Sequence, residues 1–478
     1  MAQSVGSARR TGTLILGATV RTLGAWPAGW RYPGAPNDPR NDVEVLTKIA
    51  SAAEAAGLHF LYFGDWLATS AEYEYTDPYL LARIEPFAAI GYLAAITTRI
   101  GLIATVNSAH SEPYSAARSA ASIDLLSNGR VGLVVTSGSE RRSAANFGWS
   151  KVNPDSDRIA SAAEFIEVLR GLWDSWQDDA FVADVEAGKL IESSRLHTLA
   201  YRGTYQSALG PLNVIRPPQG HVPVGLVGSA ENARDLAARA ADFSFITAGT
   251  LASTIDSYST AKEATAAAGR DPADHVLLAS ILPVVAPTRE GAWAIYDELV
   301  EILPVETVSG HPSAGQLPPN RTIRTLAAIL GVPLTGILID EIVPPRVAER
   351  FTPQGRRLID VVGARSGRAI GGRRGITYRH LLVAHAVVAP IIVGSAEDVA
   401  DHLESWYRLR AVDGFTVLSA FADQLEAFTT LVVPELQRRG LFPEQYGGAS
   451  LRDHFGLEVP PNSNELVDFV DNPFIRPI

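Results

Sequence analysis

Two hydrophobic periods alternate along this chain. Short apolar runs rich in β-branched residues, which are typical of buried strands, are followed by segments with apolar residues at helical spacing. The first apolar run is Leu14–Val20, and the helix predicted after it covers residues 42–56, with Asp42 as its cap and Gly57 at its end. Further strands are predicted at residues 60–63, 100–104, 131–135, 222–227, 243–246, 277–285 and 412–418, and further helices at 85–97, 111–126, 159–176, 230–241 and 424–439.

Strands that are apolar throughout and separated by helices indicate a parallel sheet covered on both faces. Eight such strands are predicted, which is the number that closes a (β/α)₈ TIM barrel, with the first strand beside the last. An open doubly wound sheet would need a switch point in the strand order, and the sequence gives no sign of one. The predicted fold class is therefore α/β, a TIM barrel.

Two stretches interrupt the alternation, at about residues 177–221 and 300–392, and residues 442–478 form a C-terminal extension. Both stretches are longer than barrel connections usually are, so we interpret them as insertions into one domain that spans residues 1–478. The second insertion contains the apolar runs 326–330 and 337–342, which would expose too much apolar surface in a free loop. We expect these runs to cover the barrel mouth and to keep a substrate pocket dry.

Composition excludes several classes of protein. The net charge of −11 argues against a nucleic-acid partner, which would require a basic surface. The chain has no cysteine, so disulfides, a thiolate nucleophile and cysteine-ligated metals are excluded. It contains no apolar stretch long enough for a membrane span and no secretory signal, and we expect a cytoplasmic protein without a membrane partner.

Active residues of TIM barrels lie where strands end. The predicted strand ends carry Asp65, Thr105, Thr136 and Ser137, which makes them candidate ligand-binding residues. A glycosidase would place two carboxylates there, and only Asp65 is suitably placed. His110 follows the third strand and is the candidate proton donor. Metal-binding motifs are absent from the sequence, so no metal site is predicted.

The strand that ends at Val227 is followed directly by Gly228, Ser229 and Ala230, where a helix begins. Backbone N–H groups at such a helix start are suited to a phosphate. Gly394-Ser395 repeats the pattern, and at both places a plain helix cap remains an alternative. A phosphate at this position and a planar group over small strand-end residues would fit FMN.

Several segments in order along nearly the whole chain carry a family resemblance. They include Glu112-Pro113-Tyr114, Asp124-Leu125-Leu126-Ser127, Val135-Thr136-Ser137, Ala145-Asn146-Phe147-Gly148, Leu172-Trp173-Asp174-Ser175-Trp176, Gly210-Pro211-Leu212-Asn213, Pro217-Pro218-Gln219-Gly220, Val412-Asp413-Gly414-Phe415 and the stretch from Val433 to Phe442. In these segments the chain resembles the luciferase-like flavin-dependent monooxygenases, in particular the branch of nitrilotriacetate, dibenzothiophene-sulfone and long-chain alkane monooxygenases.

The resemblance implies noncovalent FMN, supplied as FMNH₂ by a separate NAD(P)H:flavin reductase, and O₂ as co-substrate. It implies a small apolar substrate, such as an organosulfur compound, an amine, a halogenated aromatic compound or an alkane, and a homodimer or homotetramer. By position, it places Asp65 and Thr105 beside the flavin ring and ribityl chain, Thr136 and Ser137 beneath the flavin, and Ser229 at the phosphate.

The sequence departs from the family at one informative place. Where the family carries His-x-x-Arg-Tyr, this chain has Asp155, Arg158 and Ile159, so only the arginine is kept. The loss of the histidine and tyrosine leaves two alternatives open: a noncatalytic partner subunit that has lost its flavin site, and an oxidoreductase that uses a deazaflavin coenzyme on the same barrel.

Overall fold

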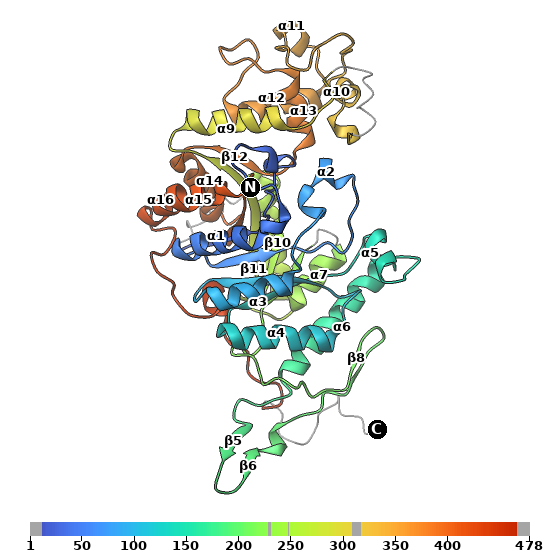
Figure 1. Ribbon diagram of the computed structural model, residues 1–478, viewed down its shortest axis with the longest axis vertical. Coiled ribbons are helices and arrows are strands. Elements are labelled where there is room, and N and C mark those ends of the chain that lie inside the picture. The colour runs from blue at the N-terminus through green and yellow to red at the C-terminus, as the bar shows by residue number, and fades with distance from the viewer. Residues whose placement is uncertain (1–11, 228–230, 247, 308–316, 466–478) are drawn as a thin grey trace, which may run out of the picture.

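A closed ring of eight parallel strands forms the centre of the molecule (Figure 1). The structure is a computed structural model that describes residues 12–227, 231–246, 248–307 and 317–465. The ring is closed by β13 pairing with β1 and by β10 pairing with β11, so the predicted TIM barrel is confirmed. In barrel order the strands are β1 (Ile15–Thr19), β2 (Phe60–Phe63), β3 (Gly101–Asn107), β4 (Val131–Thr136), β9 (Val224–Val227), β10 (Phe243–Ile246), β11 (Val276–Val285) and β13 (Gly414–Leu418).

Helices cover the outside of this ring, where alternate strand residues such as Leu16, Leu102 and Leu133 are fully buried against them. Some of these helices begin with a side-chain cap; the Glu85 carboxylate, for example, accepts hydrogen bonds from the backbone N–H groups of Phe87 and Ala88 at the start of α3. The predicted cap Asp42 is instead the first residue of α1, and the N-cap residue Asn41 makes no side-chain cap hydrogen bond. The covering helices are α1 (Asp42–Ala55), α3 (Pro86–Ile96), α4 (Pro113–Ser127), α6 (Asp155–Trp173), α7 (Glu231–Ala240), α8 (Leu251–Ala267), α9 (Arg289–Ile302), α14 (Ala396–Arg408), α15 (Asp423–Ala427) and α16 (Val433–Arg438). The short helices α2 (Tyr73–Thr76) and α5 (Arg141–Asn146) lie in the loops after β2 and β4.

The last predicted helix, residues 424–439, is interrupted in the structure. A π-helical turn at Phe428–Val432 separates α15 from α16. Pro434 lies at the start of α16 and has no N–H group to continue the preceding helical hydrogen bonds, which accounts for the change of register.

Aromatic side chains and glycines share the barrel interior at the amino ends of the strands. A Cβ on Gly17 would lie 2.4 Å from the Phe60 ring, and one on Gly225 would lie 2.3 Å from the Phe243 ring. Both rings need the space that these glycines leave. The barrel is therefore filled at this end, and space for a ligand must be at the other end.

The insertion at residues 300–392 builds a second hydrophobic core on an extension of β11. The strand β12 (Ile391–Gly394) pairs with this extension outside the closed ring. The core joins α9 and α10 (Ile323–Leu330), α11 (Pro345–Ala348), α12 (Pro353–Ser366) and α13 (Tyr378–Ala386), which lie together at the top of Figure 1. Trp26 and Phe421, from the loops after β1 and β13, are buried in it. The apolar runs of the insertion therefore contribute to this core, which lies against one side of the barrel mouth.

The insertion at residues 177–221 forms two hairpins and crosses to the opposite end of the molecule. They are β5 (Phe181–Asp184) with β6 (Lys189–Ile191), and β7 (Tyr201–Arg202) with β8 (Ser207–Ala208). Figure 1 shows the β5–β6 hairpin extending away from the barrel, far from α10–α13.

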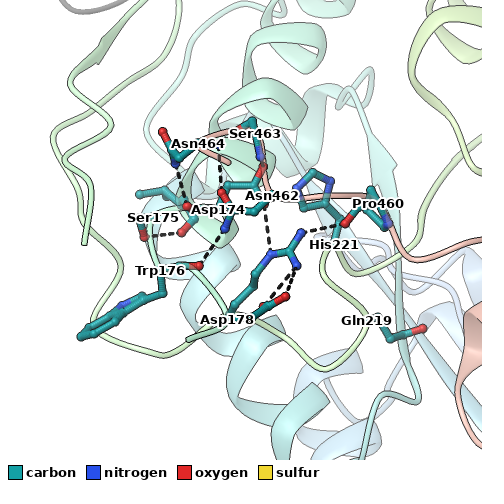
Figure 2. Close-up of polar contacts among 12 residues, drawn as sticks. Asp174, Ser175, Trp176, Asp178, Gln219, His221, Pro460, Asn462, Ser463 and Asn464 are labelled. Atoms are coloured by element: carbon teal, nitrogen blue, oxygen red, sulfur yellow. Dashed lines mark hydrogen bonds and ion pairs between the residues drawn. The ribbon is translucent and has the colours of Figure 1, made fainter. Parts of the chain in front are cut away.

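The C-terminal extension closes the amino end of the barrel. Leu451 and Phe455 of α17 (Leu451–Phe455) pack inside the strands, and the Phe455 ring lies 5.3 Å from that of Phe243. Beyond α17, the chain binds Asp174, whose carboxylate accepts from the Ser463 N–H at 3.1 Å (Figure 2). The extension is thus part of the barrel structure.

Within the described residues, the helices are too short or too polar to cross a lipid bilayer.

Candidate functional site

A cleft of about 280 Å³ lies at the carboxyl ends of four neighbouring strands, β2, β3, β4 and β9. Its volume is close to the lower end of the roughly 300–1,000 Å³ that is usual for ligand sites. The wall consists of small polar residues with a few apolar ones: Asp65, Trp66, Leu67, Asn107, Thr136, Ser137, Gly138, Ser139, Glu140, Ser143 and Val227.

Three of the predicted site residues, Asp65, Thr136 and Ser137, line this cleft together. The Asp65 carboxylate accepts a hydrogen bond from the Trp66 N–H at 2.8 Å. Burial raises the pKa of Asp65, while that hydrogen bond and the charge of Arg83 act in the opposite direction.

Thr105 lies one layer deeper than its predicted position. Its side chain is buried, and its hydroxyl lies 2.9 Å from the carbonyl oxygen of Phe63 and 3.1 Å from the Tyr62 hydroxyl. The reason is that β3 continues to Asn107, three residues beyond the predicted strand end, so that Asn107 takes the place at the mouth. Thr105 is buried against Tyr62 and does not line the cleft.

His110 lies in the loop after β3, outside the residues that line the cleft. Its ring is stacked on Phe147, with the ring centroids 4.5 Å apart, and meets the edge of Trp149 at 5.0 Å. Its Nδ1 is buried and has no hydrogen-bond partner among the described residues. Burial lowers the pKa of His110, so the imidazole is neutral at neutral pH.

The predicted phosphate residues Gly228, Ser229 and Ala230 lie outside the described residues. The preceding residue, Val227, lines the cleft, and β9 lies directly beside β4. The second copy of the motif is a helix cap: the Ser395 side chain accepts from the Asp398 N–H, and the Asp398 carboxylate accepts from the Ser395 N–H. A carboxylate thus already occupies that helix start, which leaves no free N–H group of Ser395 for a phosphate.

Arg158, in the first turn of α6, brings a positive charge to the cleft. Its Nη1 donates to the Ser137 hydroxyl at 3.3 Å, and its Nε donates to the Asn153 carbonyl oxygen at 3.1 Å. Its Nη2 forms an ion pair with Asp155. The Arg158 side chain is only 10% exposed, so the guanidinium is held against the wall. The family motif points to this residue, but the motif alone does not reveal its contact with Ser137.

A second guanidinium supports the β2 side of the cleft. Arg83 donates from Nη2 to the Trp66 carbonyl oxygen at 2.9 Å, and its Nε lies 4.0 Å from the Asp65 carboxylate. Its guanidinium lies 5.4 Å from the centre of the Tyr79 ring, and that of Arg21 lies 5.6 Å from the same ring. Burial lowers the pKa of Arg83, and the charge of Arg21 adds to this effect.

Tyr62 was not singled out from the sequence. The run Phe60–Phe63 predicted a strand and no role for Tyr62. Because side chains alternate along a strand, the Tyr62 side chain points into the barrel. The Tyr62 ring stacks on that of Phe245 at 4.6 Å, and burial raises the pKa of its phenol. Below the cleft the barrel is therefore sealed by aromatic rings. Within the described residues, there is no group of His, Cys, Asp or Glu side chains that could hold a metal ion.

The sequence profile of the luciferase-like monooxygenase family matches residues 24–413. Among curated proteins, the chain is 35% identical to the N-acetyl-S-(2-succino)cysteine monooxygenase of Bacillus subtilis (strain 168) and 34% identical to component A of the nitrilotriacetate monooxygenase of Aminobacter aminovorans, in each case over 94% of this chain and 97% of the other protein. Among solved structures, riboflavin lyase with modified FMN and riboflavin superposes with a TM-score of 0.72 at 25% identity, covering 94% of this chain and 97% of that one. These matches extend over nearly the whole chain and agree with the closed barrel and with the cleft at its mouth. The chain belongs to the luciferase-like monooxygenase family and is a flavin-dependent monooxygenase.

Proposed function

We propose that this protein is the oxygenase of a two-component system, which receives FMNH₂ from a separate NAD(P)H:flavin reductase and uses O₂ to oxygenate a small organic compound. The observation that carries the proposal is the cleft at the barrel mouth, where hydroxyl-bearing residues and one buried arginine meet at the ends of β4 and β9. Bound FMNH₂ would supply the electrons that activate O₂.

The residues of the cleft suit FMN. Its phosphate needs a cation and hydrogen-bond donors, and Arg158 and Ser137 offer both at one end of the cleft. Its planar ring needs a wall without bulky side chains. Gly138 adds no side chain to this wall, and it packs so closely against Asn107 that a Cβ there would lie 2.8 Å from Oδ1 of Asn107. We assign Ser229, which follows β9 and precedes α7 in the sequence, to the phosphate as well.

Within this proposal, the other residues orient and shield the flavin. Asp65 and Thr136 are assigned to the ring and ribityl chain, and Thr105 supports them from below through Tyr62. The apolar side chains of Leu67 and Val227 limit access of water to the reacting atoms. His110 was the candidate proton donor, but burial lowers its pKa and favours the neutral imidazole, so we assign its N–H group as a hydrogen-bond donor from the loop beside the cleft.

We further propose an organosulfur compound or an amine as substrate, with a carboxylate as an additional recognised group. The names of the two curated relatives denote acids that contain sulfur or nitrogen. Arg83, beside Asp65 and Trp66, is the cation that favours such an acid here over a wholly apolar compound.

The test uses the purified protein with FMN, NADH, a flavin reductase and ¹⁸O₂. We expect one ¹⁸O atom in the product of an acidic sulfide or amine such as N-acetyl-S-(2-succino)cysteine or nitrilotriacetate. Dimethyl sulfide and a long-chain alkane test the apolar alternative. Substrate oxidation that needs an oxidised deazaflavin as hydride acceptor and adds no ¹⁸O would support the deazaflavin alternative. Binding of no flavin at all would support a noncatalytic partner subunit.

The homodimer or homotetramer and the cytoplasmic location remain expectations beside this proposal. Sedimentation of the purified protein would measure the first.

A further inference from the structure

The ion pair between Asp155 and Arg158 places a carboxylate on the cation that FMN phosphate would use. Asp155 is the first residue of α6, and its side chain is 76% exposed, whereas that of Arg158 is 10% exposed. The arginine is therefore fixed in the wall, while the aspartate reaches it from solvent.

We propose that Asp155 competes with the flavin phosphate for Arg158 and so weakens the binding of FMN and speeds its release. The inference rests on the proposed function, because it needs a phosphate-bearing cofactor in this cleft. Asp155 is a positioning residue in this account, since it acts on the flavin through Arg158.

Arg158 is the cation best placed for the phosphate. Among the described residues, two guanidiniums donate hydrogen bonds to residues of the cleft wall, Arg158 to Ser137 and Arg83 to Trp66. Of these two, Arg158 lies at the end of the cleft formed by β4 and β9, where Ser137 and Val227 line it.

Electrostatics gives the direction of the effect. In the free protein, Asp155 neutralises Arg158. A phosphate that binds Arg158 must either displace this carboxylate or lie beside it, and two anions at one guanidinium repel each other. Because Asp155 is largely exposed, it can turn into solvent when the phosphate arrives, so binding is weakened and not prevented.

Weak binding of flavin suits a two-component oxygenase. Reduced flavin must enter from the reductase, and oxidised flavin must leave before the next turnover. A carboxylate that returns to Arg158 as the phosphate leaves lowers the barrier to release.

The experiment compares Asp155→Asn with Asp157→Asn, which removes the same charge from the same helical turn without an ion pair to Arg158. Binding of FMN and of riboflavin, which has no phosphate, is measured by fluorescence titration of the full chain. We expect Asp155→Asn to bind FMN roughly five- to twentyfold more tightly, the range for removal of one competing ionic hydrogen bond. Riboflavin affinity in this variant, and FMN affinity in Asp157→Asn, should remain within about twofold of wild type. Asp155→Ser gives a second variant without the charge and should match Asp155→Asn.

Three results would overturn the inference: FMN binding to Asp155→Asn that is no tighter than to wild type, an equal gain for riboflavin, or an equal gain in Asp157→Asn. Wild-type protein that binds neither FMNH₂ nor FMN would instead contradict the proposed function, so the two failures are distinguishable.

Discussion

Which side chains line the cleft depends on the residue at which each strand ends. The sequence indicated Asp65, Thr136 and Ser137 correctly as residues of one cleft, because each follows an apolar run that ends at the barrel mouth. Thr105 was predicted at the same level, but β3 extends further and buries it. Arg158 and Arg83 reach the wall from α6 and from the loop after β2, and contacts of long side chains across loops have no local pattern in the sequence.

Arg83→Met tests the carboxylate part of the substrate proposal. With an acidic substrate we expect KM to rise about 10- to 100-fold, with a smaller change in kcat, because the variant loses one hydrogen bond between charged groups. KM for dimethyl sulfide should not change. Arg379→Met is a matched control, because the Arg379 side chain is 12% exposed and pairs with Asp340 on the second core. Equal losses for acidic and neutral substrates would show that Arg83 only stabilises the loop.

At the scale of elements, the eight barrel strands and six of the helices were predicted from the apolar period, and most of their ends lie within a few residues of the predictions. The helices α8 and α9 were not predicted. The helix cap that the sequence left open as an alternative at Ser395 does form. The similar capping box at Ser450 was not predicted. The break at Phe428–Val432 was missed, because Pro434 was not weighed against a strong apolar period. The ion cluster of the second core was beyond prediction, since it joins α9 to residues more than 70 positions away.

That cluster gives a pH prediction. Asp297 of α9 lies 2.7 Å from Arg368 and 2.6 Å from Arg374. Burial alone would raise the pKa of Asp297, but its contacts with His380 at 3.5 Å and with Arg368 lower it from 3.8 to about 2. The folded pKa is below the unfolded one, so the stabilisation is present above about pH 4 and is lost as the pH falls toward 2. Asp297→Asn should cost about 2 kcal/mol at pH 7 in urea unfolding, with the difference shrinking below pH 4.

Asp340→Asn is the control for this measurement, since the Asp340 carboxylate is 64% exposed and its pair with Arg379 should contribute less than about 1 kcal/mol. A penalty for Asp297→Asn that stays constant from pH 7 to pH 3 would contradict the assignment.

For the whole molecule, strict alternation of strands and helices was enough to predict the barrel. The alternation did not predict how the insertion at 300–392 and the C-terminal extension pack against the barrel. The insertion at 300–392 was expected to cover the mouth, whereas its described residues form a second core with Trp26 and Phe421 and line none of the cleft. The extension at 442–478 was predicted without a place in the barrel, and in the structure α17 enters the barrel. Both outcomes depend on contacts between segments hundreds of residues apart, which a reading of one sequence does not resolve.

Leu451→Ala tests whether the extension completes the barrel. The Leu451 side chain fills space left by Gly101 and Gly132, where a Cβ would lie 2.5 and 2.6 Å from it. We expect a loss of about 2–5 kcal/mol in the free energy of unfolding, as for other buried leucines. Leu126→Ala, at a leucine that is 76% exposed on α4, should cost less than about 0.5 kcal/mol. Similar small losses for both variants would mean that α17 only rests on the barrel.

The most direct test of the account is anaerobic titration of the full chain with FMNH₂, with reduced riboflavin alongside, in wild type and in Arg158→Met. The account predicts saturable binding of one FMNH₂ per chain, weaker binding of reduced riboflavin, and an Arg158→Met variant that binds FMNH₂ about 10- to 100-fold more weakly and no longer distinguishes the two flavins. Equal affinity of the wild type for both flavins, or unchanged FMNH₂ affinity in Arg158→Met, would contradict the placement of the flavin phosphate at the ends of β4 and β9.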